Sequence, residues 1–241
     1  MRSVRIAVVI PALDEAETIG EAVESAGNAR GETPIDDDLA IETETEIEIV
    51  VVDGGSRDRT VDRAQAAGAR VLTSPPGRAL QLETGWRATE GEVVLFLHAD
   101  TRLPRDWARA VRAALADPGV AGGAFRLRFD ERSLGLAIVE WGAALRARWA
   151  RLPYGDQALF ARRTALAACG GIAPVEIAED LDLVRALRGA GRLALLPQAV
   201  VTSARRYRRG GVLRTWWINA VALAAWRVGV DRARIARWVR S

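Results

Sequence analysis

Three aspartates, far apart in the sequence, stand where a carboxylate can do chemistry. Asp53 and Asp100 each follow an apolar run, where a carboxylate can accept hydrogen bonds from a nucleobase or ribose, or bind a divalent cation. Mg²⁺ and Mn²⁺ prefer oxygen ligands, and Mg²⁺ often bridges to substrate phosphates through only one or two carboxylates. Asp180 lies in "EIAEDLDL", where it can take a proton from a hydroxyl nucleophile. Together these residues indicate a cation beside a phosphorylated substrate and a base for an attacking hydroxyl.

Each of these positions also has a structural interpretation. Gly54 and Gly55 can form an ordinary turn, and Asp100 can begin a helix. The carboxylates within 179–182 can simply balance a helix dipole. His98 is the only histidine, and its expected role is that of a packed, hydrogen-bonded residue. No G-x-S-x-G sequence, dinucleotide-binding fingerprint or P-loop is present, so serine-type catalysis and those phosphate-binding loops are not supported.

A dense cluster of cations follows near the C-terminus. It comprises Arg205, Arg206, Arg208 and Arg209. Arginine forks match phosphate oxygens, and a diphosphate leaving group needs such neutralisation as its bond breaks. A solvated loop and an electrostatic membrane contact are the alternatives.

Composition limits the partners and the compartment. The chain has 241 residues, one cysteine and no lysine, and its net charge is +3. Acidic residues dominate 14–48, whereas 200–241 holds ten arginines and a single acid. A basic tail suits nucleic acid, anionic lipid or a phosphorylated substrate. A single cysteine and an N-terminus unlike a signal peptide fit a reducing, cytoplasmic location.

Alternating elements predict an α/β fold. Apolar strands are expected at 4–12, 47–55, 69–74 and 92–100, with helices between them. Continuous apolar strands of this kind form a mostly parallel central sheet flanked by helices, and ligands bind at the carboxyl ends of its strands. Pro11, Asp53 and Asp100 are therefore expected on one rim of the sheet. The acidic segment 30–46 is expected to be an exposed, flexible insertion.

The second half continues with further helices and strands. A helix at 133–152 has its apolar face at Leu134, Ala137, Ile138, Trp141 and Leu145. The other expected elements are helices at 104–119 and 179–191, a strand at 121–130, a strand and helix within 157–171, and a strand at 192–201.

The C-terminal extension is apolar and basic. The stretch 213–230 is apolar nearly all round, but its uncharged part is too short for the roughly 20 residues that cross a bilayer. The following segment, 231–241, places Ile235, Trp238 and Val239 on one face and arginines elsewhere. Such a helix is typical of an anionic membrane surface. Packing on the domain, or in a homodimer through the C-terminal helices, is the alternative.

Five segments in order resemble the family-2 glycosyltransferases. They are "VVIPALDEAETI", "IVVVDGGSRDRT", "GEVVLFLHADT", "GDQALFARR" and "AEDLDLVRALRGAG". The segments "LHADT", "PYGDQ" and "TSARR" resemble in particular the subgroup called rSAM/selenodomain-associated transferase 2. The resemblance implies the nucleotide-diphospho-sugar transferase (GT-A) fold over 1–205, with 206–241 as a C-terminal helical extension.

The resemblance also implies roles for individual residues. Asp180 would be the general base, and Asp100 would bind Mn²⁺ or Mg²⁺ on the diphosphate. The acceptor side would include Tyr154, Gly155, Asp156, Gln157 and Glu179. The donor, with uridine diphosphate as the expected nucleotide, would contact Pro11, Ala12, Leu13, Glu15, Asp53, Gly54, Gly55, Arg78, Ala99, Asp100, Arg205 and Arg206.

Four departures from the family pattern bear on these roles. Asp14 and Glu83 stand where relatives commonly have asparagine, and Tyr207 replaces a frequent tryptophan. His98-Ala99-Asp100 replaces an Asp-x-Asp motif, so one metal carboxylate is missing. Modest metal affinity is therefore expected.

The sequence thus predicts an inverting, metal-dependent glycosyltransferase. It would move a sugar from a nucleoside-diphosphate sugar to a hydroxyl or carboxyl acceptor, with a lipid-like acceptor as a hypothesis. A nucleotide-sugar-binding or membrane-docking protein without turnover, and a nucleotidyltransferase, are the alternatives. Nucleic acid is not an expected partner, because the first third is acidic and no recognition motif is present. The expected location is cytoplasmic, with peripheral attachment to the inner face of the membrane as an extension.

Overall fold

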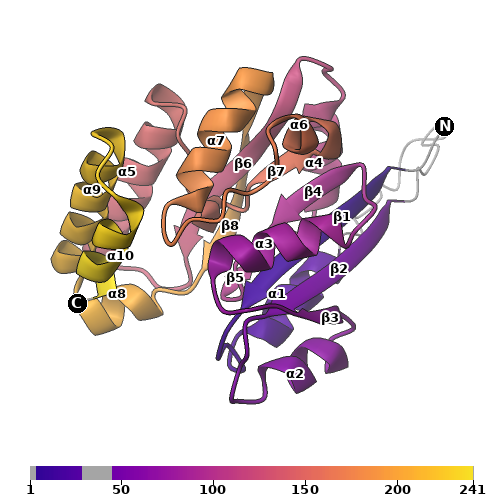
Figure 1. The fold of residues 1–241 in the computed structure, drawn as a ribbon, viewed down its shortest axis with the longest axis horizontal. Helices are drawn as coiled ribbons and strands as arrows, with labels where there is room; N and C mark the ends of the chain where they lie inside the picture. The colour runs from indigo at the N-terminus through magenta and orange to yellow at the C-terminus, as the bar shows by residue number, and fades with distance from the viewer. Residues whose placement is uncertain (1–3, 29–44, 241) are drawn as a thin grey trace.

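A curled mixed sheet forms the centre of the protein. The computed structural model describes residues 4–28 and 45–240, and most of the expected insertion 30–46 lies outside the described residues. The strand order is β3-β2-β1-β4-β7-β6-β8-β5 (Figure 1). The strands are β1 (Arg5–Ala12), β2 (Glu46–Asp53), β3 (Arg70–Thr73), β4 (Val93–Phe96), β5 (Thr101–Arg102), β6 (Val120–Phe129), β7 (Phe160–Arg162) and β8 (Arg192–Thr202).

The first four strands of the chain are parallel to one another. Strands β1 to β4 pair in parallel, β7 runs antiparallel to β4 and β6, and β5 runs antiparallel to β8. The α/β fold class predicted from the sequence is confirmed. Because Ala12 pairs with Asp53 and Leu97 donates to the Val9 carbonyl, the ends of β1, β2 and β4 meet at one rim.

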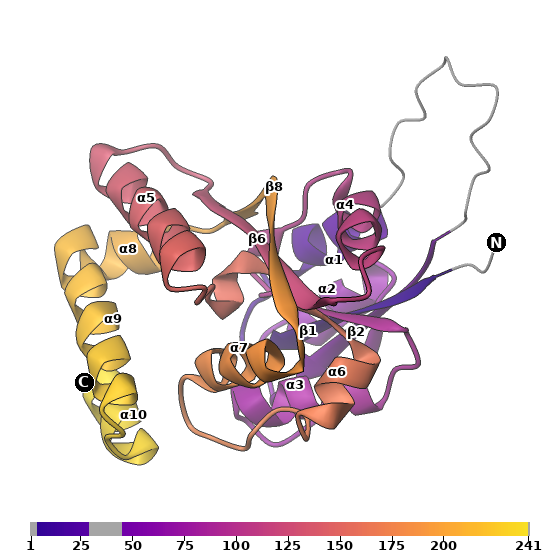
Figure 2. The same ribbon diagram turned by 90° about the horizontal axis from the view of Figure 1, so that it is seen from above.

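Helices cover both faces of the sheet. Alternate residues of β1 explain this, because Ile6, Val8 and Ile10 join one core with α1 and α4, whereas Val9 joins another with α3, α6 and α7 (Figure 2). The helices are α1 (Ile19–Gly27), α2 (Thr60–Ala66), α3 (Arg78–Arg87), α4 (Trp107–Leu115), α5 (Leu134–Trp149), α6 (Arg163–Ala168), α7 (Glu179–Ala190), α8 (Arg205–Gly210), α9 (Val212–Arg227) and α10 (Arg232–Arg240), with a 3₁₀ turn η1 (Gly155–Gln157).

Helix α5 buries the face opposite to the one that carries most of its large apolar residues. Its buried residues are Leu136, Val139, Ala143 and Ala147. The expected apolar face, Leu134, Ala137, Ile138, Trp141 and Leu145, is exposed instead. Both faces of this helix are apolar, and the inward face packs against Leu127 and Phe129 of β6 and against Ala204, Tyr207 and Val212.

The C-terminal helices pack on the domain. Ile235 and Ala236 of α10 are buried, so this part of the expected apolar face packs on the protein, whereas Trp238 is 41% exposed. Among the helices of the described residues, none is long and apolar enough to cross a bilayer. The basic cluster at 205–209, for which a solvated loop was the alternative, forms the short helix α8.

Helix α3, which the sequence patterns do not predict, lies tightly against the sheet. Gly85 permits this close contact, because a Cβ at residue 85 would collide with Val9 and lie 3.0 Å from Val52. Gly142 of α5 is also inside a helix, but a Cβ there would meet no atom within 4 Å.

This contrast gives a stability prediction. We expect Gly85→Ala to lower the free energy of unfolding by about 1–3 kcal/mol, because a methyl group overpacks the contact. Gly142→Ala is the matched control and should leave stability unchanged or raise it by about 0.5–1 kcal/mol, since alanine favours a helix. Urea denaturation followed by circular dichroism measures both. Equal stability of the two variants would show that α3 does not pack as described.

Candidate active site

The rim of the sheet opens into a cavity that we call the α7–α9 cavity. It has a volume of about 240 Å³, and both Asp100 and Asp180 line it. Its inner wall comes from the sheet rim, α3 and the start of α7. Its outer wall comes from α8, α9 and α10, through Tyr207, Asn219 and Ile235 among others. The structure thus brings a strand-end carboxylate and the predicted base to one space.

A second hollow, the β1–α3 hollow, adjoins this cavity. It is lined by Pro11, Ala12, Leu13 and Glu15 after β1, by 76–78 and Gln81 around α3, and by His98, Ala99 and Asp100. Most of the residues predicted to contact a donor nucleotide therefore share one surface. Because Arg78, His98 and Asp100 line both spaces, these three side chains mark the passage between them.

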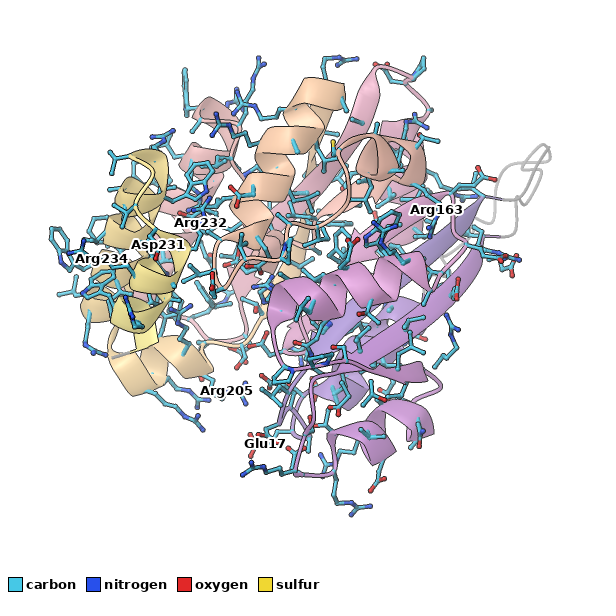
Figure 3. The ribbon with its side chains drawn as sticks, viewed as in Figure 1. Glu17, Arg163, Arg205, Asp231, Arg232 and Arg234 are labelled. Carbon is cyan, nitrogen blue, oxygen red and sulfur yellow. The ribbon has the colours of Figure 1, made fainter. Side chains whose placement is uncertain are left out.

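The predicted arginines reach the same place from the far end of the chain. Arg205 Nη2 donates to Glu15 Oε2 at 2.6 Å, across 190 residues of sequence. A third hollow is lined by Glu15, Asp100, Arg205 and Arg206. Arg205, the first residue of α8, lies on the side of α8 that faces the N-terminal strands (Figure 3). Both arginines thus line a hollow that Asp100 also lines, where a diphosphate would need positive charge.

Asp53 lies at the end of β2, paired with Ala12 of β1 on the rim of the sheet. Its buried carboxylate accepts from the backbone N–H of Gly55 at 3.0 Å and of Ser56 at 3.1 Å, and so it holds the turn after β2. Gly54 donates its N–H to the Ala12 carbonyl at 2.9 Å and lies next to Gln81, so this turn adjoins two residues that line the β1–α3 hollow.

Gln81 is a site residue that the sequence analysis missed. Its buried Nε2 donates to the carbonyls of Ala12 at 2.7 Å and Val52 at 2.8 Å. The side chain therefore clamps the ends of β1 and β2 while it lines the β1–α3 hollow. Recognising α3 as a helix would have placed Gln81 one turn after Arg78 and on the same side.

Glu83, two residues later, does not face the donor surface. Its carboxylate accepts from Trp86 Nε1 at 2.5 Å and from the Ile172 N–H at 2.8 Å. Glu83, which stands where relatives commonly have asparagine, therefore stabilises the packing of α3 against the loop after α6.

Arg78 links the two spaces through partners on both sides. It pairs with the buried Glu179, with Nε and Oε1 3.1 Å apart, and its Nη2 contacts His98 Nε2. Burial, then the charges of Arg78 and Arg206, lower the pKa of His98 well below its ordinary value, so the imidazole is neutral. A neutral ring can accept from Arg78, which assigns His98 a role in holding that guanidinium.

Asp180 is held by backbone N–H groups. Gly155 N donates to its Oδ2 at 2.7 Å, and Leu181 N lies 2.8 Å from Oδ1. A Cβ at residue 155 would meet the Arg78 guanidinium and lie 3.2 Å from both Asp180 Oδ2 and His98 Nε2. The glycine thus permits the close approach that fixes the carboxylate.

Asp156 is a further carboxylate in the α7–α9 cavity. Its Oδ1 is enclosed and has no hydrogen-bond partner. Burial raises its pKa to about 6, with Arg146 opposing and the charge of Asp180 adding to the rise. Tyr154 and Glu179 line the same cavity, whereas Gln157 is a structural residue that donates to the Phe125 carbonyl at 2.9 Å. Three of the predicted acceptor-side residues therefore line the cavity.

Helix α7 is tied to the outer wall of the cavity. Asp182 accepts from Trp226 Nε1 at 2.8 Å and from Arg232 Nη2 at 2.8 Å. These bonds join the helix that carries Asp180 to α9 and α10, so the C-terminal helices form part of the site.

The oxygen ligands available at the site fit a cation that is shared with a substrate. Among the described residues, no group of three or more His, Cys, Asp or Glu side chains is arranged to hold a metal ion. Asp100 nevertheless lines all three hollows, beside Arg205 and Arg206. Burial raises the pKa of Asp100, and Arg205 opposes this. A single carboxylate completed by phosphate oxygens is a usual Mg²⁺ arrangement.

Solved structures of the same fold are sugar transferases. A mannosyltransferase from Pyrobaculum calidifontis, in complex with GDP-Man and Mn²⁺, has a TM-score of 0.67 at 21% identity over 92% of this chain and 62% of its own. Glucosyl-3-phosphoglycerate synthase from Mycobacterium tuberculosis, in complex with Mn²⁺ and UDP-glucose, has a TM-score of 0.62 at 22% identity over 95% of this chain and 80% of its own. These likenesses confirm the GT-A type of fold.

The family follows from the sequence itself. Residues 7–176 match the family model Glycosyl transferase family 2, and the chain belongs to this family. The glucosyl-3-phosphoglycerate synthase of Mycolicibacterium paratuberculosis is 36% identical over 108 residues, which are 41% of this chain and 29% of that protein. The match thus spans less than a third of the length of that relative.

The raised pKa of Asp156 predicts a pH dependence of stability. The folded pKa of about 6 lies above the ordinary value of 3.8, so the folded protein binds this proton more tightly than the unfolded chain. The resulting stabilisation is complete below about pH 4 and is lost as the pH rises through about 6. We expect Asp156→Asn to raise the free energy of unfolding by about 1–2 kcal/mol at neutral pH and to change it little near pH 4.

Denaturant titrations between these pH values measure the effect. Asp62→Asn, which changes an exposed carboxylate on α2, is the control and should keep the pH profile of the unmodified protein. A profile of Asp156→Asn that parallels the unmodified protein would contradict the assignment.

Proposed function

We propose that the chain is an inverting, metal-dependent glycosyltransferase that uses a nucleoside-diphosphate sugar. The observation that carries the proposal is the shared cavity of Asp100 and Asp180, next to the β1–α3 hollow. One space suits a donor, the other suits an acceptor, and the reacting atoms would meet at the passage between them.

The donor would lie in the β1–α3 hollow with its diphosphate toward Asp100. Pro11, Ala12 and Leu13 would border the nucleoside, and Asp53 would act through the turn that it holds. UDP-glucose and GDP-mannose in the similar structures support a nucleoside-diphosphate sugar, with UDP as our first choice. Asp100 would hold Mn²⁺ or Mg²⁺, which would neutralise charge on the diphosphate as it leaves.

The protein's own side chains would carry the proton and the leaving-group charge. Asp180, fixed by the N–H of Gly155, would accept the proton of the acceptor hydroxyl as its oxygen attacks the anomeric carbon. Arg205 and Arg206 would stabilise the diphosphate that departs from the opposite face. Attack and departure on opposite faces invert the anomeric centre.

The lining of the α7–α9 cavity supports an acceptor that is partly apolar. Leu181 on the inner wall faces a set of apolar residues from α9 and α10, namely Ala222, Leu223, Ile235 and Val239. Asp156, Tyr154 and Glu179 stand at the polar end. We infer a lipid-like or otherwise amphiphilic acceptor whose hydroxyl lies at Asp180 and whose apolar part lies along α9. A carboxyl acceptor would bring a negative charge next to Asp156 and Glu179, and these two carboxyl groups disfavour it.

A protein that binds the nucleotide-sugar without turnover would not depend on Asp180 as a base. We expect Asp180→Asn to lower kcat by about 10²–10⁴-fold while donor affinity stays within a few-fold, because only proton removal is lost. Radiolabelled sugar transfer and calorimetric UDP binding measure the two quantities. Glu176→Gln, an exposed carboxylate four residues earlier, is the matched control and should keep full activity. Near-normal turnover by Asp180→Asn would refute the role of this residue.

The anomeric outcome tests inversion directly. With a UDP-α-sugar, we expect a β-linked product, read from the proton coupling constant at the anomeric carbon in an NMR spectrum of the initial product. An α-linked product would instead require retention and a different use of the carboxylates.

A further inference from the structure

One large apolar surface of the protein has no partner within the described residues. It is the outward stripe of α5, formed by Leu134, Ile138, Trp141, Leu145 and Trp149, and its members are 87, 64, 66, 41 and 76% exposed. Their spacing places them along one side of the helix. Exposed large side chains that gather in this way mark an interaction site rather than ordinary surface.

A second helix adds to this surface at the same end of the molecule. Helices α5 and α9 lie together, away from the N-terminal strands, in both views (Figures 1 and 2). They meet at their first turns, where Gly135 packs against Val212. Leu213 and Trp217, which follow on α9, are 83 and 62% exposed. Two tryptophans on α5 and two on α9, Trp216 and Trp217, are therefore exposed at this end.

Exposed arginines stand at both ends of the apolar stripe and beside Leu213. Arg132 precedes α5, Arg151 follows it, and Arg214 is next to Leu213 on α9. Arg148, seven residues after Trp141, lies on the same side of α5 as the stripe and is exposed.

We propose that the α5–α9 end of the protein docks on an anionic lipid bilayer. Tryptophan rings suit the boundary between headgroups and acyl chains, and arginines attract the anionic headgroups around them. A second copy of this chain is disfavoured as the occupant, because pairing the same face twice would bring two arginine-rich surfaces together. The docking face is thus different from α10, which the sequence suggested and whose Ile235 is buried.

This surface also explains why a partly apolar acceptor would reach the cavity. The other side of α9 contributes Ala222 and Leu223 to the α7–α9 cavity. A protein docked through α5 and α9 would hold that cavity next to the lipid surface. The docking itself does not depend on the proposed transferase activity, and it is tested without it.

Sedimentation with lipid vesicles tests the proposal on the full chain. The probes are vesicles of phosphatidylcholine alone and of phosphatidylcholine mixed with phosphatidylglycerol. We expect the protein to bind the mixed vesicles and to be released by salt. Combined Ile138→Gln, Trp141→Gln and Trp149→Gln should lower the partition coefficient at least about tenfold, since three exposed apolar side chains no longer insert.

Controls separate docking from folding and from self-association. Leu195→Gln, at a 40% exposed residue of β8, should bind vesicles like the unmodified protein. Circular dichroism and UDP binding should be the same for all variants. The proposal is overturned if the unmodified protein ignores the mixed vesicles or if the triple variant binds them equally. It is also overturned if sedimentation equilibrium shows a dimer that the triple variant dissociates, because a second copy then covers the stripe.

Discussion

The site depends on a single close approach, the one between Gly155 and the start of α7. The N–H of Gly155 donates to Asp180, and the space beside its Cα is occupied by Arg78, with His98 nearby. Four segments of the chain meet here: the end of β4, the start of α3, the η1 turn and α7. A side chain at residue 155 would meet the ends of the Arg78, Asp180 and His98 side chains, so this glycine lets the three polar groups gather at the start of α7.

The electrostatics of the site follow from the same packing. Glu179 and Asp180 lie next to each other at the first turn of α7, and burial raises the pKa of Glu179 while Arg78 opposes that rise. Arg78 also contacts His98, whose neutral ring does not repel the guanidinium. The Arg78 side chain lines the passage between the two hollows. On the donor side, Glu15 pairs with Arg205. Arg78 and Arg205 are therefore held by a carboxylate or a ring nitrogen before any substrate arrives.

The sequence predicted the parts of the site that lie directly after apolar strands. Pro11, Asp53 and Asp100 could be placed on one rim, because parallel strands end on the same side of a sheet. The Gly155–Asp180 contact could not be predicted, since it joins the η1 turn to the first turn of α7, 25 residues later, and their approach depends on tertiary packing. Helix α5 shows a different limit. Periodicity identifies its apolar faces, but only the space beside β6 decides that Ala143 turns inward and Trp141 outward.

In the mechanism that we propose, Asp100 joins the donor to the cavity of Asp180 through a shared cation. Calorimetric titration of UDP, with and without Mn²⁺, measures this link. We expect Mn²⁺ to strengthen UDP binding about tenfold or more in the unmodified protein and in Asp180→Asn, and we expect this gain to disappear in Asp100→Asn. A gain that survives in Asp100→Asn would contradict it.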